Sequence, residues 1–170
     1  MLAQPVAADE ATIGDPGDVA AVRRLLTQLY DSWGNADAFA GFFTEDADYI
    51  AFDGTHSKGR SAIAESHRPL FEHFLKGSRL FGEPPTIRLL TPNVALIHGK
   101  GAVLRAGQQR PSSKRLSIQT LIAVKQGEVW RLAAFHNTRY RPFAQTLLGK
   151  LLAFAGLAPG SSEKQSKSDR

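Results

Sequence analysis

The chain has 170 residues, of which 42% are hydrophobic, and this length suits one domain with its own apolar core. It contains no cysteine, so disulfides, thiolate zinc sites and a cysteine nucleophile are excluded. The formal net charge is +5, but lysine and arginine are scattered and no basic run is interleaved with aromatic residues. We therefore expect no nucleic-acid partner.

The first residues carry no targeting or membrane signal. Residues 1–14 include Asp9 and Glu10, have no early lysine or arginine, and lack a continuous apolar run. Neither a secretory signal nor a membrane span is therefore predicted. We expect a cytoplasmic protein with a flexible N-terminus over residues 1–14 and no membrane partner.

Two helices are predicted after this segment. Asp15 is a typical N-cap, and Pro16 suits the first helical position. Apolar residues then recur every three or four positions, at Val19, Val22, Leu26, Leu29, Tyr30 and Trp33. Gly34 ends this helix, and a short second helix is predicted over residues 36–43.

A third helix is predicted over residues 61–76. Ile63, His67, Leu70, Phe71 and Phe74 fall on one face of it, which is therefore expected to be buried. Pro69 lies inside the pattern and should kink the helix, because proline lacks the backbone N–H that the helix needs.

Strands dominate the remainder of the chain. A short strand over residues 47–52 precedes the third helix, and four more are predicted over residues 80–90, 94–105, 114–126 and 129–139. Helices followed by a strand meander indicate an α+β domain over residues 15–140, with helices on one side of an antiparallel sheet. Residues 141–157 are predicted to be a helical extension, and residues 158–170 a disordered tail.

The last hairpin predicts which side chains share a face of the sheet. A two-residue turn at Gln126 and Gly127 would pair Ser117 with His136 and Gln119 with Ala134. One face would then carry Ser117, Gln119, Leu121, Ala123, Trp130, Leu132, Ala134 and His136. We expect this face to look towards the helices, and its polar members to meet His67 in an otherwise apolar interior.

The opposite face of the same hairpin is strongly aliphatic. It would carry Ile118, Ile122, Val124 and Phe135. One layer of helices cannot cover both faces, so we expect this outer face to pack on a second copy in a homodimer.

Several motifs resemble a known family, and together they cover residues 18–139. The chain is similar to the SgcJ/EcaC group of the SnoaL-like, nuclear-transport-factor-2-like (NTF2-like) superfamily. The resemblance lies in Asp46-Ala47-Asp48-Tyr49-Ile50, Phe52-Asp53-Gly54-Thr55, Gly59-Arg60, Ser66-His67, Gly77-Ser78-Arg79-Leu80, Arg115-Leu116-Ser117-Ile118-Gln119-Thr120 and Phe135-His136-Asn137-Thr138-Arg139.

The resemblance implies a cone-shaped, curved antiparallel sheet wrapped around the N-terminal helices, often dimeric, with a pocket between sheet and helices. Members of the superfamily include isomerases, polyketide cyclases and dehydratases, and also proteins that only bind a ligand. The chain has no Gly-x-Gly-x-x-Gly motif after a strand, so we expect no nicotinamide or other cofactor.

Three ionisable residues are candidates for proton transfer. Histidine has a reference pKa of about 6.5, so His67 and His136 are candidates to move protons at neutral pH, and Asp48 could act as a base in an apolar pocket. Each also has a structural alternative, because histidines bonded to neighbours and aspartates near turns are common. No metal-ligand spacing stands out, so no metal site is predicted.

The remaining candidates would contact a small hydrophobic ligand. They are Trp33, Tyr49, Phe71, Ser117, Gln119 and Trp130. The sequence leaves two functions open: an isomerase, cyclase or dehydratase acting on a hydrophobic carbonyl compound, and a non-catalytic protein that binds or sequesters its ligand.

Overall fold

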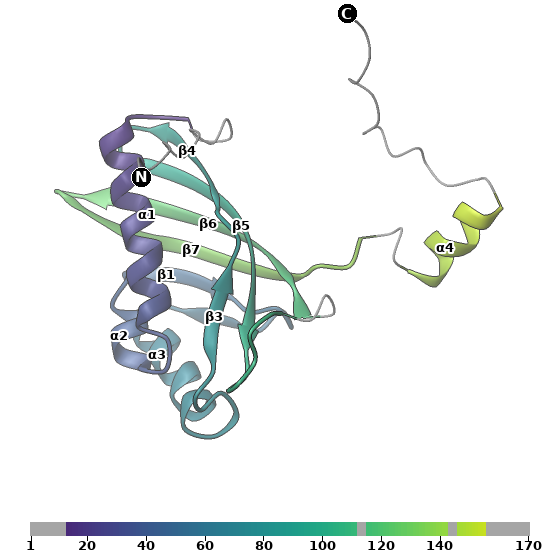
Figure 1. The fold of residues 1–170 in the computed structure, drawn as a ribbon. Coiled ribbons are helices and arrows are strands. Elements are labelled where there is room, and N and C mark those ends of the chain that lie inside the picture. Colours follow the sequence, from purple (N-terminus) through teal and green to yellow (C-terminus); the bar gives the residue numbers. More distant parts are fainter. Residues whose placement is uncertain (1–12, 112–114, 143–145, 156–170) are drawn as a thin grey trace, which may run out of the picture. The chain divides into compact units, whose positions relative to one another are not determined.

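The computed structural model describes residues 13–111, 115–142 and 146–155 (Figure 1). The chain divides into two compact units, Met1–Tyr140 and Arg141–Arg170. The first unit holds all the strands of the described residues. In the second, α4 (Leu147–Phe154) exposes Leu147, Leu148, Leu151 and Phe154. The predicted tail and almost all of the predicted flexible N-terminus lie outside the described residues.

The first two helices begin where their capping residues predict. Helix α1 (Pro16–Asp31) starts after Asp15, whose carboxylate accepts a hydrogen bond from the backbone N–H of Asp18. Helix α2 (Ala36–Ala40) starts after Asn35, whose side chain accepts from the N–H of Ala38. It ends earlier than predicted, because Phe43 already belongs to a strand.

The third helix changes its winding at the proline. Helix α3 (Arg60–Pro69) is followed by a π-helical turn, η1 (Leu70–Phe74). Pro69 cannot donate to the preceding turn, and the N–H of Leu75 bonds five residues back to the carbonyl of Leu70 at 2.7 Å. Of the predicted apolar face, Ile63, His67 and Phe71 are buried, whereas Phe74 is exposed.

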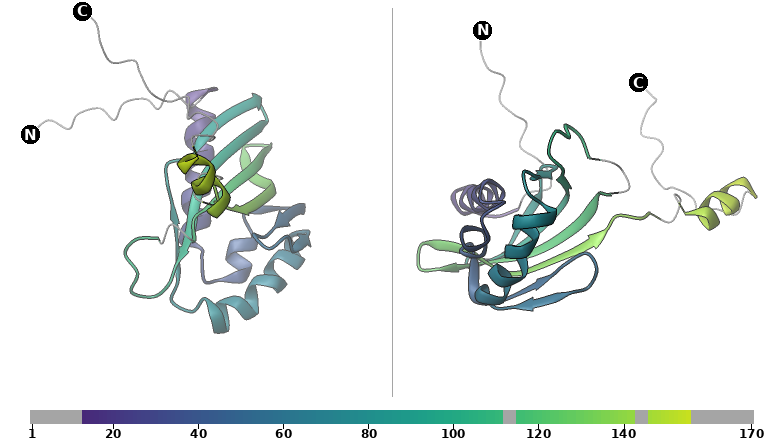
Figure 2. Two further views of the ribbon diagram at one scale, coloured as in Figure 1. Left: turned by 90° about the vertical axis from the view of Figure 1, so that its right-hand side faces the viewer. Right: turned by 90° about the horizontal axis from the view of Figure 1, so that it is seen from below.

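The seven strands form one curved sheet, and helices α1, α2 and α3 lie on one side of it (Figure 2). They are β1 (Phe43–Ile50), β2 (His56–Lys58), β3 (Arg79–Gly82), β4 (Thr86–Thr91), β5 (Val94–Leu104), β6 (Ser117–Gln126) and β7 (Val129–Arg139). Their order is β2-β1-β7-β6-β5-β3, and β4 also pairs with β5. The sheet is mixed and not wholly antiparallel as predicted, because β1 runs parallel to β7. The predicted strand over residues 80–90 is two strands, β3 and β4.

The predicted register of the last hairpin was wrong. Its turn is Gly127-Glu128, with Gln126 paired to Val129 and Gly127 at φ +62°. A β-bulge follows, since Ala123 pairs with Leu132 but the adjacent Ile122 pairs with Ala134, which leaves Ala133 without a partner.

The bulge reverses the alternation of faces in the second half of β7. Phe135 is buried and its ring stacks on that of Tyr49, with centroids 4.7 Å apart, so Phe135 does not belong to the outer face. His136 is exposed, and Ser117 pairs with Arg139 instead. The predicted inward position of His136 is therefore wrong as well.

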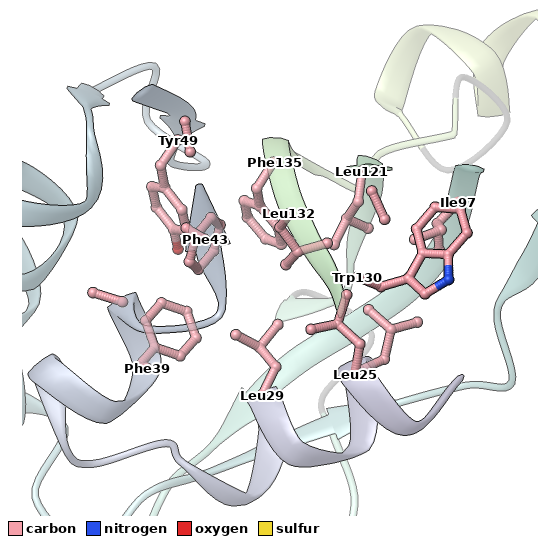
Figure 3. Close-up of a cluster of buried hydrophobic side chains, with 14 of the residues drawn as sticks. Leu25, Leu29, Phe39, Phe43, Tyr49, Ile97, Leu121, Trp130, Leu132 and Phe135 are labelled. Carbon is pink, nitrogen blue, oxygen red and sulfur yellow. The ribbon is translucent and has the colours of Figure 1, made fainter. Parts of the chain in front are cut away.

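The core fills the space between α1, α2 and the sheet. Leu25 and Leu29 of α1 point towards Trp130 and Leu132 of β7 (Figure 3). Other fully or nearly fully buried members of this cluster are Val22, Phe39, Phe43, Ile63, Ile97 and Leu121. These side chains are buried against one another, and the pocket described below is lined by other residues.

Candidate functional site

The inner face of the sheet changes from apolar to polar along the strands. One row across β5, β6, β7 and β1 contains Ile97, Leu121, Phe135 and Tyr49, all buried. The next row contains Gly99, Gln119 and Asn137, and the one after it Gly101, Ser117 and Arg139. Polar side chains therefore gather where β6 begins and β7 ends, which we call the open end.

A pocket of about 350 Å³ lies at the open end. Its lining residues are Phe52, Leu75, Ala102, Val103, Arg115, Leu116, Ser117, Asn137 and Arg139. They come from the loop after β1, the turn after η1, the end of β5, the two residues before β6 and its first residue, and the end of β7. Apolar walls with a few polar groups are typical of small-molecule sites.

Asn137 contributes an unsatisfied polar atom to this pocket. Its Oδ1 is buried and makes no hydrogen bond within the described part of the chain. Ser117 does not supply one, since its hydroxyl donates to the carbonyl of Gly101 at 3.1 Å. A buried acceptor without a partner costs about 1–3 kcal/mol, so a ligand or water that donates to it gains binding energy.

Gln119 lies next to this pocket but is not among its lining residues. Its side chain packs over Gly101, where an added Cβ would come within 2.9 Å of Gln119 Nε2. Glycine at this position therefore leaves the room that Gln119 occupies.

His67 lies among aromatic rings and not in the pocket lining. It is 4% exposed, and its ring lies 4.8 Å from that of Phe39 and 4.9 Å from that of Tyr49, centroid to centroid. Its Nδ1 lies 2.8 Å from the carbonyl oxygen of Ile63. A carbonyl only accepts, so Nδ1 carries the proton, and Nε2 is free to accept from the Tyr49 hydroxyl at 3.3 Å.

Burial governs the titration of this pair. It lowers the pKa of His67, an effect that the hydrogen bond to the Ile63 carbonyl partly opposes. Burial likewise raises the pKa of Tyr49. Both side chains are therefore neutral at neutral pH, a histidine acceptor facing a tyrosine donor.

The three remaining aromatic candidates pack in the core and do not line the pocket. Trp33 donates through Nε1 to the Ser78 hydroxyl at 3.0 Å and meets Phe71 edge to face at 4.7 Å. Trp130 donates through Nε1 to Asp18 at 3.2 Å, which ties β7 to α1. Their predicted role as ligand contacts stays a prediction.

Asp48 and His136 both face away from the interior. Asp48 is half exposed and pairs in the ladder with Ala134, while its carboxylate lies 2.7 Å from Nε2 of His56. Tyr49, the next residue, takes the inner position because side chains alternate along a strand. The structure thus separates the three predicted proton-transfer residues and leaves only His67 inside.

The sequence prediction missed Asn137 and Arg139 as lining residues. Both belong to the motif Phe135-His136-Asn137-Thr138-Arg139, but regular alternation through the hairpin would turn them outward. No sequence signal marked the bulge at Ala133. Among the described residues, no cluster of three or more histidine or acidic side chains could hold a metal ion, and no helix is long and apolar enough to cross a membrane.

Comparisons with known proteins give structural relatives only. No protein-family model matches the chain, and no curated protein does either. A domain of unknown function with a cystatin-like fold from Nostoc punctiforme is 33% identical, with a TM-score of 0.70, over 84% of this chain and 86% of that one.

Two further solved structures come from Novosphingobium aromaticivorans. An NTF2-like protein with a cystatin-like fold is 22% identical over 80% of this chain and 88% of its own, with a TM-score of 0.62. A candidate scytalone dehydratase is 15% identical over 74% and 85%, with a TM-score of 0.59. The curved sheet with three N-terminal helices on its inner side and the 33% identity to the Nostoc punctiforme domain lead to one conclusion: this chain belongs to the same family as that domain, which has a cystatin-like fold.

Proposed function

We propose that the chain binds one small, largely apolar molecule in the pocket at the open end. The proposal rests on the buried Oδ1 of Asn137, which has no hydrogen-bond partner among the described residues and lies in a pocket with apolar walls. We also propose, from the sequence, that the chain belongs to the SgcJ/EcaC group and that it is cytoplasmic.

A neutral fluorescent probe, N-phenylnaphthylamine, tests the binding site. Val103 is half-buried and lines the pocket, so Val103→Phe should fill part of it. We expect the probe's affinity to fall by about tenfold, equivalent to about 1.4 kcal/mol. Leu90→Phe, at an exposed position of β4 outside the pocket lining, is the control and should leave the affinity unchanged. Equal affinities for all three proteins would contradict the proposal.

Proton-transfer catalysis is the second candidate function, and the His67–Tyr49 hydrogen bond favours it. A neutral imidazole is a competent base once a substrate displaces the Tyr49 hydroxyl from Nε2, and the released hydroxyl can then donate to a carbonyl oxygen. Asp48 and His136 face outward. Among the described residues, neither of them therefore assists the His67–Tyr49 pair as a carboxylate or a second histidine. We therefore rank binding without catalysis first.

Hydrogen exchange next to a carbonyl distinguishes the two functions. Cyclohexanone in heavy water, followed by NMR, reports proton abstraction from carbon. If the chain is an enzyme of this kind, it should accelerate exchange, and His67→Gln should remove the acceleration while N-phenylnaphthylamine still binds. No acceleration by the unaltered chain leaves binding as the function.

A further inference from the structure

Two arginine side chains stand at the rim of the pocket. Arg139 shares the inner row of Ser117, and its guanidinium carbon lies 5.5 Å from the centre of the Phe52 ring. Arg115 is exposed and also lines the pocket. Neither arginine forms an ion pair with another described residue.

None of the described lining residues is a carboxylate that could neutralise these charges. Its other members are apolar, apart from Ser117 and Asn137. The ion pairs among the described residues, such as Asp37 with Arg68, involve other residues. The pocket therefore presents two unneutralised cations at its rim, and its potential favours an anionic group there.

The positions of the polar groups indicate how a ligand would be oriented in the pocket. Phe52 lies beneath the Arg139 guanidinium, and Leu75, Val103 and Leu116 supply further apolar wall. Arginine binds carboxylates through two parallel N–H donors, which suits a planar acid group better than a lone hydroxyl. Asn137, one row deeper than Arg139, can meet a hydroxyl group on the body of the ligand.

We propose that the ligand is an amphipathic organic acid, whose carboxylate pairs with Arg139 and Arg115 while its apolar body fills the pocket. This inference rests on the proposed binding function and specifies the chemical class of the ligand. It requires no covalent step, because recognition is by charge, hydrogen bonds and apolar contact.

Two probes that differ by one anionic group test the inference. Anilinonaphthalene sulfonate carries a sulfonate that N-phenylnaphthylamine lacks. In the double variant Arg115→Gln with Arg139→Gln, the affinity for the anionic probe should fall by about tenfold or more, while the affinity for the neutral probe changes by less than about twofold. Arg88→Gln, an exposed arginine on β4 outside the pocket lining, is the charge-matched control and should change neither affinity.

Competition then separates a carboxylate from other anions and from a purely apolar ligand. Decanoate should displace N-phenylnaphthylamine from the unaltered chain more strongly than decanol does, and the double variant should lose that preference. Melting curves establish that each variant is folded.

Each outcome has one meaning. Suppose that the neutral probe binds in the pocket but that the affinities for decanoate and for the anionic probe do not depend on the two arginines. The ligand is then not an organic acid, and the proposed binding function stands. If the neutral probe does not bind, or if Val103→Phe leaves its affinity unchanged, the proposed binding function is wrong and this inference is wrong with it. Binding of the sulfonate without a preference for decanoate over decanol also overturns the carboxylate assignment.

Discussion

His67 owes its charge state to its surroundings. Rings of Trp33, Phe39, Tyr49 and Phe71 lie around it, and both of its nitrogens have uncharged partners. Protonation of His67 would place a cation among these rings. The Tyr49 hydroxyl could not donate to the protonated ring, and none of the hydrogen-bond partners described for His67 is a carboxylate. The folded state therefore holds the neutral ring, whereas the unfolded chain protonates it freely.

This difference predicts how stability depends on pH. Because the pKa of His67 is lower in the folded state than its usual 6.5, the unfolded chain binds more protons between the two values. Stability should thus be retained above about pH 6.5 and fall as the pH decreases towards the folded pKa, by at most about 1.4 kcal/mol per pH unit. Urea unfolding at several pH values measures this dependence of the free energy of unfolding on pH.

The variant His67→Gln isolates this contribution. Gln cannot titrate, so the stability of the variant should depend less on pH between neutrality and about pH 5. Asp18, Asp37 and Asp53 have lowered pKa values through their hydrogen bonds, so their effect appears only at lower pH, near and below 3.8. Parallel pH profiles for the two proteins would refute the assignment to His67.

Among the secondary-structure elements, the hairpin of β6 and β7 has the largest effect on the site. Its bulge at Ala133 lets Trp130 and Leu132 face the core near the turn and still places Asn137 and Arg139 on the inner face at the other end. Without an extra residue, the alternation of side chains would put His136 in the pocket and Asn137 outside. One unpaired residue thus changes which polar groups meet a ligand.

Strand β5 supplies a test of close packing beside the site. A Cβ at Gly101 would lie 2.9 Å from the backbone oxygen of Phe81 and equally close to Gln119, whereas one at Gly99 would meet nothing nearer than 3.7 Å. Gly101→Ala should therefore destabilise the fold by about 1–3 kcal/mol, because backbone must move. Gly99→Ala should change stability by less than about 0.5 kcal/mol.

Chemical denaturation of both alanine variants measures the difference. Gly99 and Gly101 lie on the same strand and the same face, so each serves as the control for the other. Equal stabilities would mean that β3 can shift away from β5 without cost.

At the scale of the whole molecule, no helix of the described residues in the first unit covers the outer face of the sheet. Its aliphatic residues are half-buried at most, and they are Leu96, Ile118, Ile122 and Val124. Phe135, which we expected there, faces the core. The face is thus less aromatic than predicted, yet it keeps an aliphatic centre that a second copy could cover.

We predict a homodimer through this outer face. Sedimentation of the unaltered chain at tens of micromolar, about the upper working range for weak dimers, should give twice the mass of one chain. Ile122→Lys, at the centre of the face, should yield monomers, because a buried ammonium at a two-fold interface would meet its own copy. Phe74→Lys, at an exposed position of η1 away from the sheet, should remain dimeric. A monomer in the unaltered chain would refute the prediction.

Local sequence patterns predicted the class of fold and the order of the helices and of the longer strands. Capping at Asp15, apolar spacing in α1 and the break at Pro69 act over a few residues, so local chemistry predicts them. Ser117 and Gln119 likewise lie on the inner face of β6, as strand alternation indicates.

Only the tertiary structure decided which residues form the pocket. The bulge at Ala133 and the parallel pairing of β1 with β7 depend on contacts between distant segments, which no local pattern encodes. They place Asn137 and Arg139 at the open end, turn His136 outward, and bury His67 behind aromatic rings. A shift of one residue in a strand reverses every following side chain, and the energy that selects the shift comes from packing across the whole core.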